Sequence, residues 1–245
     1  FTEQQVAGGD FNAQMFNSFL DGTKSALEMA AVSNGCDLSP PQDGLMFPPC
    51  GVDDLPDILR PVSAGGILSQ KGTVEVVSSI ERDGRPVFRD LRWGVYVVFE
   101  APSQYVMDCF SQYGLKTDKS GKYAAMYKPY HLIGLELGIS VATIAVRGEA
   151  TGATGDWKAD VVATAKRNLK TGDKLDGEGG FTVYGKLMTA ADSLRLGALP
   201  IGLAHNMVLK KDIPAGKPVC WDDVDYDATK QAIQFRQEME RVFRQ

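Results

Sequence analysis

An eleven-residue segment that occurs twice constrains the fold of this 245-residue chain more than any other feature. The first copy is AKRNLKTGDKL, residues 165–175, and the second is LKKDIPAGKPV, residues 209–219. Both copies follow the pattern apolar–Lys–basic–Asn/Asp–apolar–x–x–Gly–x–x–apolar. Each copy is typical of a short strand that ends in a charged turn, where the glycine takes a positive φ. The repeat predicts a small, pseudo-symmetric β unit between Asp160 and Asp225.

A second constraint comes from FNSFLDGTKSALEMAAV, residues 16–32, which has helical spacing and predicts a helix over residues 12–34. One face of this helix carries four polar residues, Asn17, Asp21, Lys24 and Glu28. Surface ion pairs use the same spacings and are worth about 0.2–0.5 kcal/mol each, so a solvated face and a functional site both stay open. Gly22 would cost a helix interior about 1 kcal/mol relative to alanine. Its presence favours a close approach by another backbone or by a ligand.

The rest of the chain alternates short elements of both kinds. Apolar patterns predict strands at 73–80, 93–100 and 123–127, helices at 104–113, within 127–148 and at 228–243, and a hairpin turn at Asp83-Gly84. The last helix should dock through Ala232, Phe235, Met239 and Val242/Phe243. The small residues at 148–156 are the best domain boundary. Together these elements predict an α+β fold.

Composition excludes several classes of protein. A net charge of -5 argues against nucleic acid or a membrane surface as a partner, and no run reaches the 18 apolar residues of a spanning helix. Four scattered cysteines without a CxxC pair, together with two histidines, argue against a structural zinc site. They indicate reduced thiols and a cytoplasmic location.

Two blocks of sequence resemble known families. The segment AKRNLKTGDKL…GEGGFTVYGKL…LPIGLAHNMVLKKDIPAGKPVCWDDV resembles a SAF domain, which is a β-clip module. FNSFLDGTKSALEMA and YKPYHLIGLELGISV resemble the catalytic region of homoserine-dehydrogenase-like NAD(P)-dependent oxidoreductases that carry a C-terminal SAF domain. Within that group the chain is most similar to 1-deoxy-D-xylulose 5-phosphate reductoisomerase-like proteins.

The resemblance implies a division into three modules and a general activity. The modules are a catalytic and dimerisation region at 1–155, a SAF domain at 156–227 and a docking helix at 228–245. The implied activity is that of an NADP(H)-dependent oxidoreductase or reductoisomerase of isoprenoid biosynthesis. Its substrate would be a small polyol-derived carbonyl compound, with phosphorylation left open, and the protein would be a homodimer. The identity of the substrate, the choice of NADP over NAD and the need for a divalent metal also stay open.

The chain departs from such enzymes in one respect. A dinucleotide-binding unit needs G-x-G-x-x-G between a strand and a helix, and neither GEGG at 177–180 nor the AGG segments match it. FTEQQVAGGD at the start also lacks an initiating Met and a signal-peptide pattern. We therefore expect this chain to be the C-terminal part of the enzyme, neither binding NADP(H) nor turning over substrate by itself.

The same resemblance assigns roles to the polar helix face. Lys24 would donate a hydrogen bond to the substrate oxygen and stabilise the developing alkoxide. Asp21 and Glu28 would orient Lys24, with Asp21 counted among the catalytic residues and Glu28 among those near the substrate. Asn17 and Thr23 are further candidates for binding the substrate.

A second candidate group lies in YKPYHLIGLE, residues 127–136. His131 is its catalytic candidate, and Lys128, Tyr130 and Glu136 are candidates for binding an anionic or phosphorylated substrate. A histidine packed at a helix start is the other interpretation of His131. Arg60 and Lys71 are weaker phosphate candidates, whereas His205 and Trp221 are expected to be structural.

A function of another class also stays open. Because the chain has no nucleotide fingerprint, it could instead be a non-catalytic SAF-type module for carbohydrate binding or assembly. The gene sequence ahead of Phe1 discriminates between the two, since a strand–GxGxxG–helix there supports the enzyme.

Overall fold

The polar face predicted on one long helix is divided between two helices. The computed structural model describes residues 3–9 and 12–244 and has α2 at Ala13–Leu20 and α3 at Thr23–Cys36, after a short α1 at Glu3–Ala7. Gly22, between α2 and α3, has a φ of 85°. Only glycine adopts such a backbone conformation without strain. The prediction of a continuous helix over residues 12–34 is therefore wrong, because Gly22 serves to break the helix.

The chain forms two compact units. The terminal unit joins residues 1–45 to residues 154–245, and the central unit comprises residues 46–153. The later boundary lies within the predicted segment 148–156, but residues 1–45 belong to the same unit as the repeat. The predicted modules at 1–155, 156–227 and 228–245 were defined by resemblance to functional regions and not by compactness. They stay a prediction.

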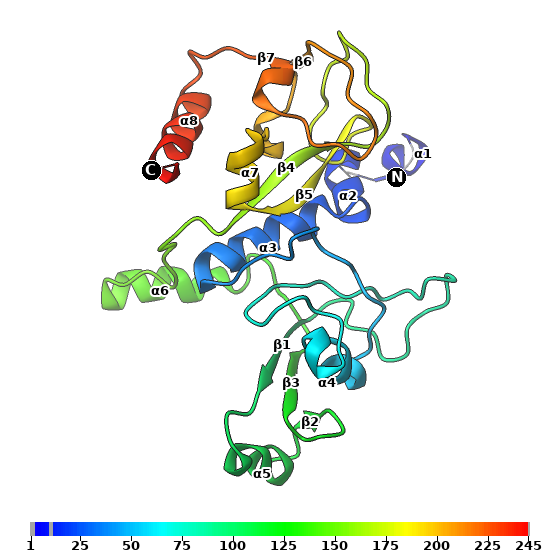
Figure 1. Cartoon of the computed structure of the whole chain (residues 1–245), viewed down its shortest axis with the longest axis vertical. Coiled ribbons are helices and arrows are strands. Elements are labelled where there is room, and N and C mark those ends of the chain that lie inside the picture. The colour runs from blue at the N-terminus through cyan, green and yellow to red at the C-terminus, as the bar shows by residue number, and fades with distance from the viewer. Residues whose placement is uncertain (1–2, 10–11, 245) are drawn as a thin grey trace. The chain divides into compact units, whose positions relative to one another are not determined.

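The terminal unit is built on an antiparallel pair of strands. β4, Ala159–Ala165, pairs with β5, Val183–Thr189, from Ala159↔Thr189 to Ala165↔Val183. All seven residues of β4 are buried, as expected of a strand covered on both faces. α7, Ala190–Leu196, follows β5 directly, and α3 crosses the same pair of strands (Figure 1).

α3 packs on these strands through its small residues. Thr23, Ala26, Ala30 and Ser33 are its buried positions. Gly185 of β5 permits the close approach, because a Cβ there would lie 2.9 Å from a methyl carbon of Thr23. The larger side chains Leu20 and Leu27 are exposed.

The two copies of the repeat pair with each other across a local pseudo-two-fold axis. The equivalent residues Leu169 and Ile213 exchange both backbone hydrogen bonds, at 2.8 and 3.0 Å. The bond from Gly172 N to Leu209 O, 2.8 Å, is matched by that from Gly216 N to Ala165 O, 2.8 Å. Both glycines have positive φ, 88° and 76°. The predicted pseudo-symmetric β arrangement is confirmed, and β6 at Val208–Leu209 and β7 at Val224–Asp225 pair beside it.

The C-terminal helix α8, Gln231–Phe243, docks only partly through the predicted residues. Ile233 and Glu240 are buried, whereas Phe235 and Val242 are exposed. Arg236 lies between Asp160, 2.5 Å away, and Glu240, 2.7 Å away. The predicted docking face is therefore only partly right: the Phe243 ring packs against Trp157, with ring centres 5.6 Å apart, but the charged network of Arg236 also faces the unit.

The central unit contains a small antiparallel sheet in the order β1-β3-β2. Its strands are Val95–Glu100, Lys116–Thr117 and Tyr123–Lys128, and its helices are α4 Leu55–Ile58, α5 Gln104–Gln112 and α6 Leu137–Arg147. These match the predicted elements at 93–100, 104–113, 123–127 and within 127–148. The strand predicted at 73–80 is wrong, since this segment makes only isolated bridges such as Ile80↔Pro86 across the Asp83-Gly84 turn. Short 3-10 helices complete the two units at Val52–Asp54, Val62–Ala64, Ile201–Leu203 and Trp221–Asp223.

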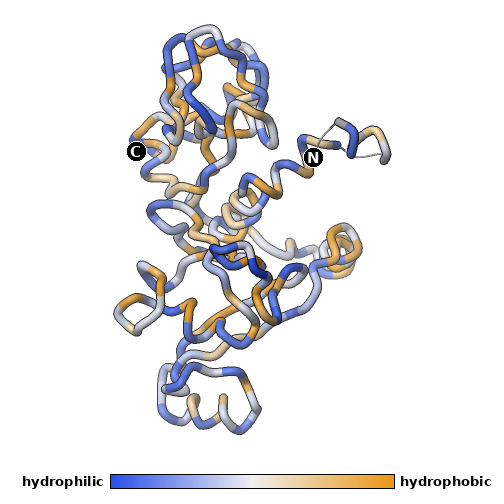
Figure 2. The backbone as a smooth tube through the Cα atoms, turned by 90° about the vertical axis from the view of Figure 1, so that its right-hand side faces the viewer, coloured by the Kyte–Doolittle hydropathy of each residue, from blue (hydrophilic) through white to orange (hydrophobic). Residues whose placement is uncertain are grey.

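α6 buries none of its residues, although most of them are apolar. The hydropathy colouring in Figure 2 shows this apolar run. Within the described parts of the chain, no helix is both long and apolar enough to cross a membrane. Helices and small antiparallel sheets in both units, with a helix near the C-terminus, confirm the predicted α+β class.

Candidate active site

The break between α2 and α3 places the Asp21 side chain against the repeat region. One oxygen, Oδ1, accepts a hydrogen bond of 2.9 Å from the backbone N–H of Thr23. The other, Oδ2, lies 2.6 Å from the ammonium nitrogen of Lys166. The two side chains are 14% and 24% exposed, so this ion pair is partly shielded from solvent. Shielding makes such a pair stronger and more fixed than an ordinary surface pair.

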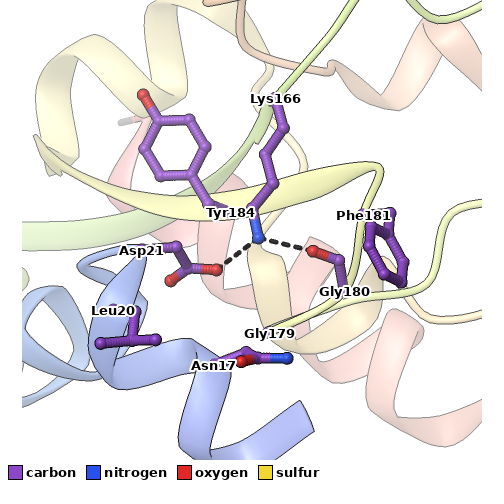
Figure 3. Close-up of a pocket in the computed structure, with 8 residues that line it drawn as sticks. All are labelled: Asn17, Leu20, Asp21, Lys166, Gly179, Gly180, Phe181 and Tyr184. Carbon is purple, nitrogen blue, oxygen red and sulfur yellow. Dashed lines mark hydrogen bonds and ion pairs between the residues drawn. The ribbon is translucent and has the colours of Figure 1, made fainter. Parts of the chain in front are cut away.

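Lys166 is held from a second direction by the loop before β5. Its ammonium donates to the carbonyl oxygen of Gly180 at 2.5 Å, and Figure 3 shows it lying between this carbonyl and the Asp21 carboxylate. Asp176 fixes the loop by accepting a hydrogen bond from the backbone N–H of Phe181, 2.5 Å. Gly179 lies directly against the backbone of Gln14 in α2, where any Cβ would clash. The loop is thus packed against α2 and Lys166 together.

These groups surround an open pocket of about 510 Å³. The residues that line it are Asn17, Leu20, Asp21, Lys166, Gly179, Gly180, Phe181 and Tyr184 (Figure 3). Burial and the nearby Asp21 carboxylate raise the pKa of Tyr184, so its phenol stays neutral at ordinary pH. The pocket presents a carboxylate, an ammonium group, a side-chain amide and an exposed aromatic ring. Such a set of groups can bind a small polar molecule.

Lys24 and Glu28 are not among the residues that line this pocket. Their side chains pair at 3.1 Å, one turn apart on α3, and both are more than one-third exposed. Lys24 was predicted to lie between the carboxylates of Asp21 and Glu28. The pair with Glu28 is present, but Asp21 pairs with Lys166 instead. The helical spacing from Asp21 to Lys24 does not apply across the left-handed residue Gly22.

Thr23 joins α3 to the strands. It is fully buried, and its hydroxyl oxygen accepts a hydrogen bond from the backbone N–H of Gly185 at 2.8 Å. This contact accounts for the threonine at the first position of the helix. Its observed role is to fix the start of α3, and the predicted substrate contact stays a prediction.

The central unit gathers the second predicted group. Lys128 pairs with Glu136 and lies 4.6 Å from the centre of the Tyr130 ring. Nδ1 of His131 lies 3.6 Å from the same carboxylate, and the histidine is exposed. The hydrogen bond from Lys128 is the main cause that lowers the pKa of Glu136. An ammonium and an imidazole therefore lie beside one carboxylate at the surface, and the Tyr130 ring lies beside the ammonium.

The weaker phosphate candidates are already engaged. Arg60 pairs with Asp118 at 2.6 Å, and Lys71 pairs with Glu100. Over the described ranges, 3–9 and 12–244, no three His, Cys, Asp or Glu side chains lie close enough to share a metal ion.

Sequence reasoning missed Lys166, Gly180, Phe181 and Tyr184 as residues of the pocket. These residues lie in the repeat region, which was interpreted as structural from its sequence. Their contact with α2 joins residues far apart in the sequence, so local spacing could not reveal it. One signal was available: the doublet Gly179-Gly180 suggests a close backbone approach, which the contact with Gln14 now explains.

A sequence model described as "Oxidoreductase DRL, catalytic domain" matches residues 2–137. The chain belongs to this family. The DRL catalytic-domain match includes Asn17, Asp21 and Lys24 from the terminal unit and His131 and Glu136 from the central unit. A search of curated proteins found no match to the chain. Membership of the DRL family establishes a general oxidoreductase role.

Proposed function

We propose that this chain is the catalytic region of an NADP(H)-dependent reductoisomerase or reductase. Its substrate would be a small, phosphorylated, polyol-derived carbonyl compound of the 1-deoxy-D-xylulose 5-phosphate type. The observation that carries the proposal is the oxidoreductase catalytic-domain match to the segment that holds both groups of candidate residues.

Lys24 is the proposed general acid. Hydride addition to a carbonyl carbon leaves negative charge on the oxygen, and a nearby ammonium both stabilises this charge and supplies a proton. The exposed pair with Glu28 supports this role, because the ammonium is oriented by one carboxylate and still accessible. Asn17 and Asp21 would contact the substrate's hydroxyl groups from the pocket that they line.

The cluster in the central unit is proposed to bind an anionic or phosphorylated group. Lys128 supplies positive charge, His131 supplies an imidazole N–H, and Tyr130 supplies a hydroxyl group. Glu136, which contacts both Lys128 and His131, would hold them in place until the ligand arrives.

The proposal includes a cofactor, a location and an assembly. NADP(H) would be bound mainly by a dinucleotide-binding unit outside these 245 residues, since they contain no G-x-G-x-x-G segment. The SAF-type repeat would support the catalytic helices, and the active form would be a cytoplasmic homodimer. Four free thiols are in keeping with a reducing location.

A substrate screen on the full-length protein tests the proposal, with NADPH absorbance as the measurement. NADPH oxidation with 1-deoxy-D-xylulose 5-phosphate, and none with its unphosphorylated analogue, is the expected result. Absence of turnover with every phosphorylated polyol carbonyl compound would remove the proposed substrate class. In parallel, NADPH fluorescence should not change when the 245-residue chain alone is added, and micromolar binding would reveal a nucleotide site within it.

A non-catalytic SAF-type binding module is the second candidate. The observation that favours it is the paired repeat, which lies beyond the family match. Under this alternative, the full-length protein binds a carbohydrate without oxidising NADPH.

A further inference from the structure

The repeat provides two equivalent lysines with different surroundings. Lys166 and Lys210 occupy the second position of the two copies. Lys166 is half-buried and contacts the Asp21 carboxylate and the Gly180 carbonyl. Lys210 is exposed, and its side chain makes no ion pair with the described residues. The pattern of the repeat therefore does not explain the buried contact of Lys166.

The contact of Lys166 continues directly into the start of α3. The carboxylate that it holds also accepts the hydrogen bond from the Thr23 N–H, 2.9 Å. Thr23 is in turn fixed to β5 by the bond from Gly185, 2.8 Å. The next residue is Lys24. Two independent ties to the strands, one ionic and one neutral, thus determine where the first turn of α3 lies.

The strength of the ionic tie follows from its geometry. The Lys166 ammonium lies 2.6 Å from the Asp21 carboxylate as an ion pair and donates a hydrogen bond to the Gly180 carbonyl at 2.5 Å. A hydrogen bond with a charged donor is roughly twice as strong as a neutral one. The backbone of Lys166 is itself fixed, because its N–H donates to the Thr182 carbonyl at 2.9 Å. Lys166 is therefore an anchored group rather than a mobile surface side chain.

We propose that Lys166 is a positioning residue of the active site: by holding Asp21 it fixes the first turn of α3, and with it the direction in which Lys24 meets the substrate. This inference rests on the proposed function of Lys24. It also gives the repeat region, which lies outside the family match, a direct part in the site.

Kinetics of full-length variants test this role. Lys166→Met should lower kcat by roughly tenfold to a hundredfold, the scale of a catalytic group displaced by about 1 Å, while KM changes less than about threefold. Lys166→Arg keeps the charge and should recover most of kcat. Lys210→Met, the matched control at the equivalent position, should behave as wild type. A kcat within twofold of wild type for Lys166→Met would overturn the proposal.

A double variant separates positioning from general support. If Lys166 acts through Asp21, adding Lys166→Met to Asp21→Asn should lower kcat by less than about twofold further. Full additivity would mean that Lys166 acts elsewhere, and the proposal would be wrong.

Amide hydrogen exchange decides the matter without any turnover. The amides of residues 23–26 should exchange at least about tenfold faster in Lys166→Met and remain unchanged in Lys210→Met. Asp21→Asn removes the same pair from the other side and replaces Lys166→Met if that variant does not fold. Unchanged exchange contradicts the positioning role. An inactive wild-type enzyme with faster exchange in the variant contradicts only the proposed function.

Discussion

The two groups of candidate residues are held together in different ways. Asp21 and Lys166 lie far apart in the sequence and form a partly shielded pair, 14% and 24% exposed. Lys128 and Glu136 are eight residues apart, and their side chains are 42% and 32% exposed. The first pair exists only because two strands, a loop and a helix break meet. The second is made within one stretch of chain.

This difference indicates a difference in use. A group fixed by tertiary contacts has little freedom to lose when a transition state forms, which suits a catalytic role. An exposed local pair contributes little to stability and can exchange its partner for a ligand. We therefore expect changes near α3 to affect kcat and changes in the central cluster to affect KM. Four experiments test this difference.

The largest effect is expected from Lys24→Ala in the full-length enzyme. Loss of the general acid should lower kcat at least about a hundredfold. Thermal unfolding should hardly change, since the pair with Glu28 is exposed. Turnover at the wild-type rate would exclude Lys24 from the mechanism. The expected effect of residues near α3 on kcat would then be wrong.

Gly185→Ala should destabilise the terminal unit. The added Cβ would lie 2.7 Å from Val161 and 2.9 Å from Thr23 side-chain carbons. Overpacking of this kind costs roughly 1–3 kcal/mol, which urea unfolding measures as a lower midpoint.

Gly35→Ala is the matched control for Gly185→Ala. Gly35 lies in α3 with nothing within 4 Å of an added Cβ, so this change should raise stability by up to about 1 kcal/mol. If the two variants unfold alike, close packing of α3 on β5 does not hold the site.

Glu136→Gln should have a small effect on substrate affinity. Surface ion pairs are worth about 0–1 kcal/mol, so loss of this carboxylate should raise KM by no more than about fivefold. Steady-state kinetics should show kcat within twofold of wild type. A large fall in kcat would mean that the central cluster takes part in the chemical step, contrary to its expected effect on KM alone.

The smallest effect concerns the titration of Glu136. Its pKa is lowered chiefly by the hydrogen bond from Lys128, so the pair's contribution to stability is present above the unfolded pKa of 4.5. That contribution is lost as the pH falls through the lower, folded pKa. Carboxyl NMR titration should show the Glu136 pKa rising towards 4.5 in Lys128→Met and unchanged in Lys119→Met. Equal pKa values in all three proteins would show that the pair does not form in solution.

Local sequence patterns predicted much of the fold. The α+β class, the strands at 93–100 and 123–127, the helix at 104–113 and the paired repeat follow from periodicity and turn residues, which act over a few positions. The strand expected at 73–80 failed, because a strand also needs a partner, and β1 pairs with β3 instead.

For the site, the spacing of residues along the chain was enough to predict the Lys24–Glu28 pair and the grouping of Lys128, Tyr130, His131 and Glu136. These contacts span at most a few turns of chain, so spacing specifies them. The contact of Asp21 with Lys166 and the burial of the small residues of α3 depend instead on long-range packing. Both outcomes depend on Gly22 and Gly185, since a left-handed residue redirects the helix and a missing Cβ admits it to the strands. A glycine in the sequence shows where the chain can turn or another segment can approach closely. Which segment lies there is determined by the packing of the whole unit.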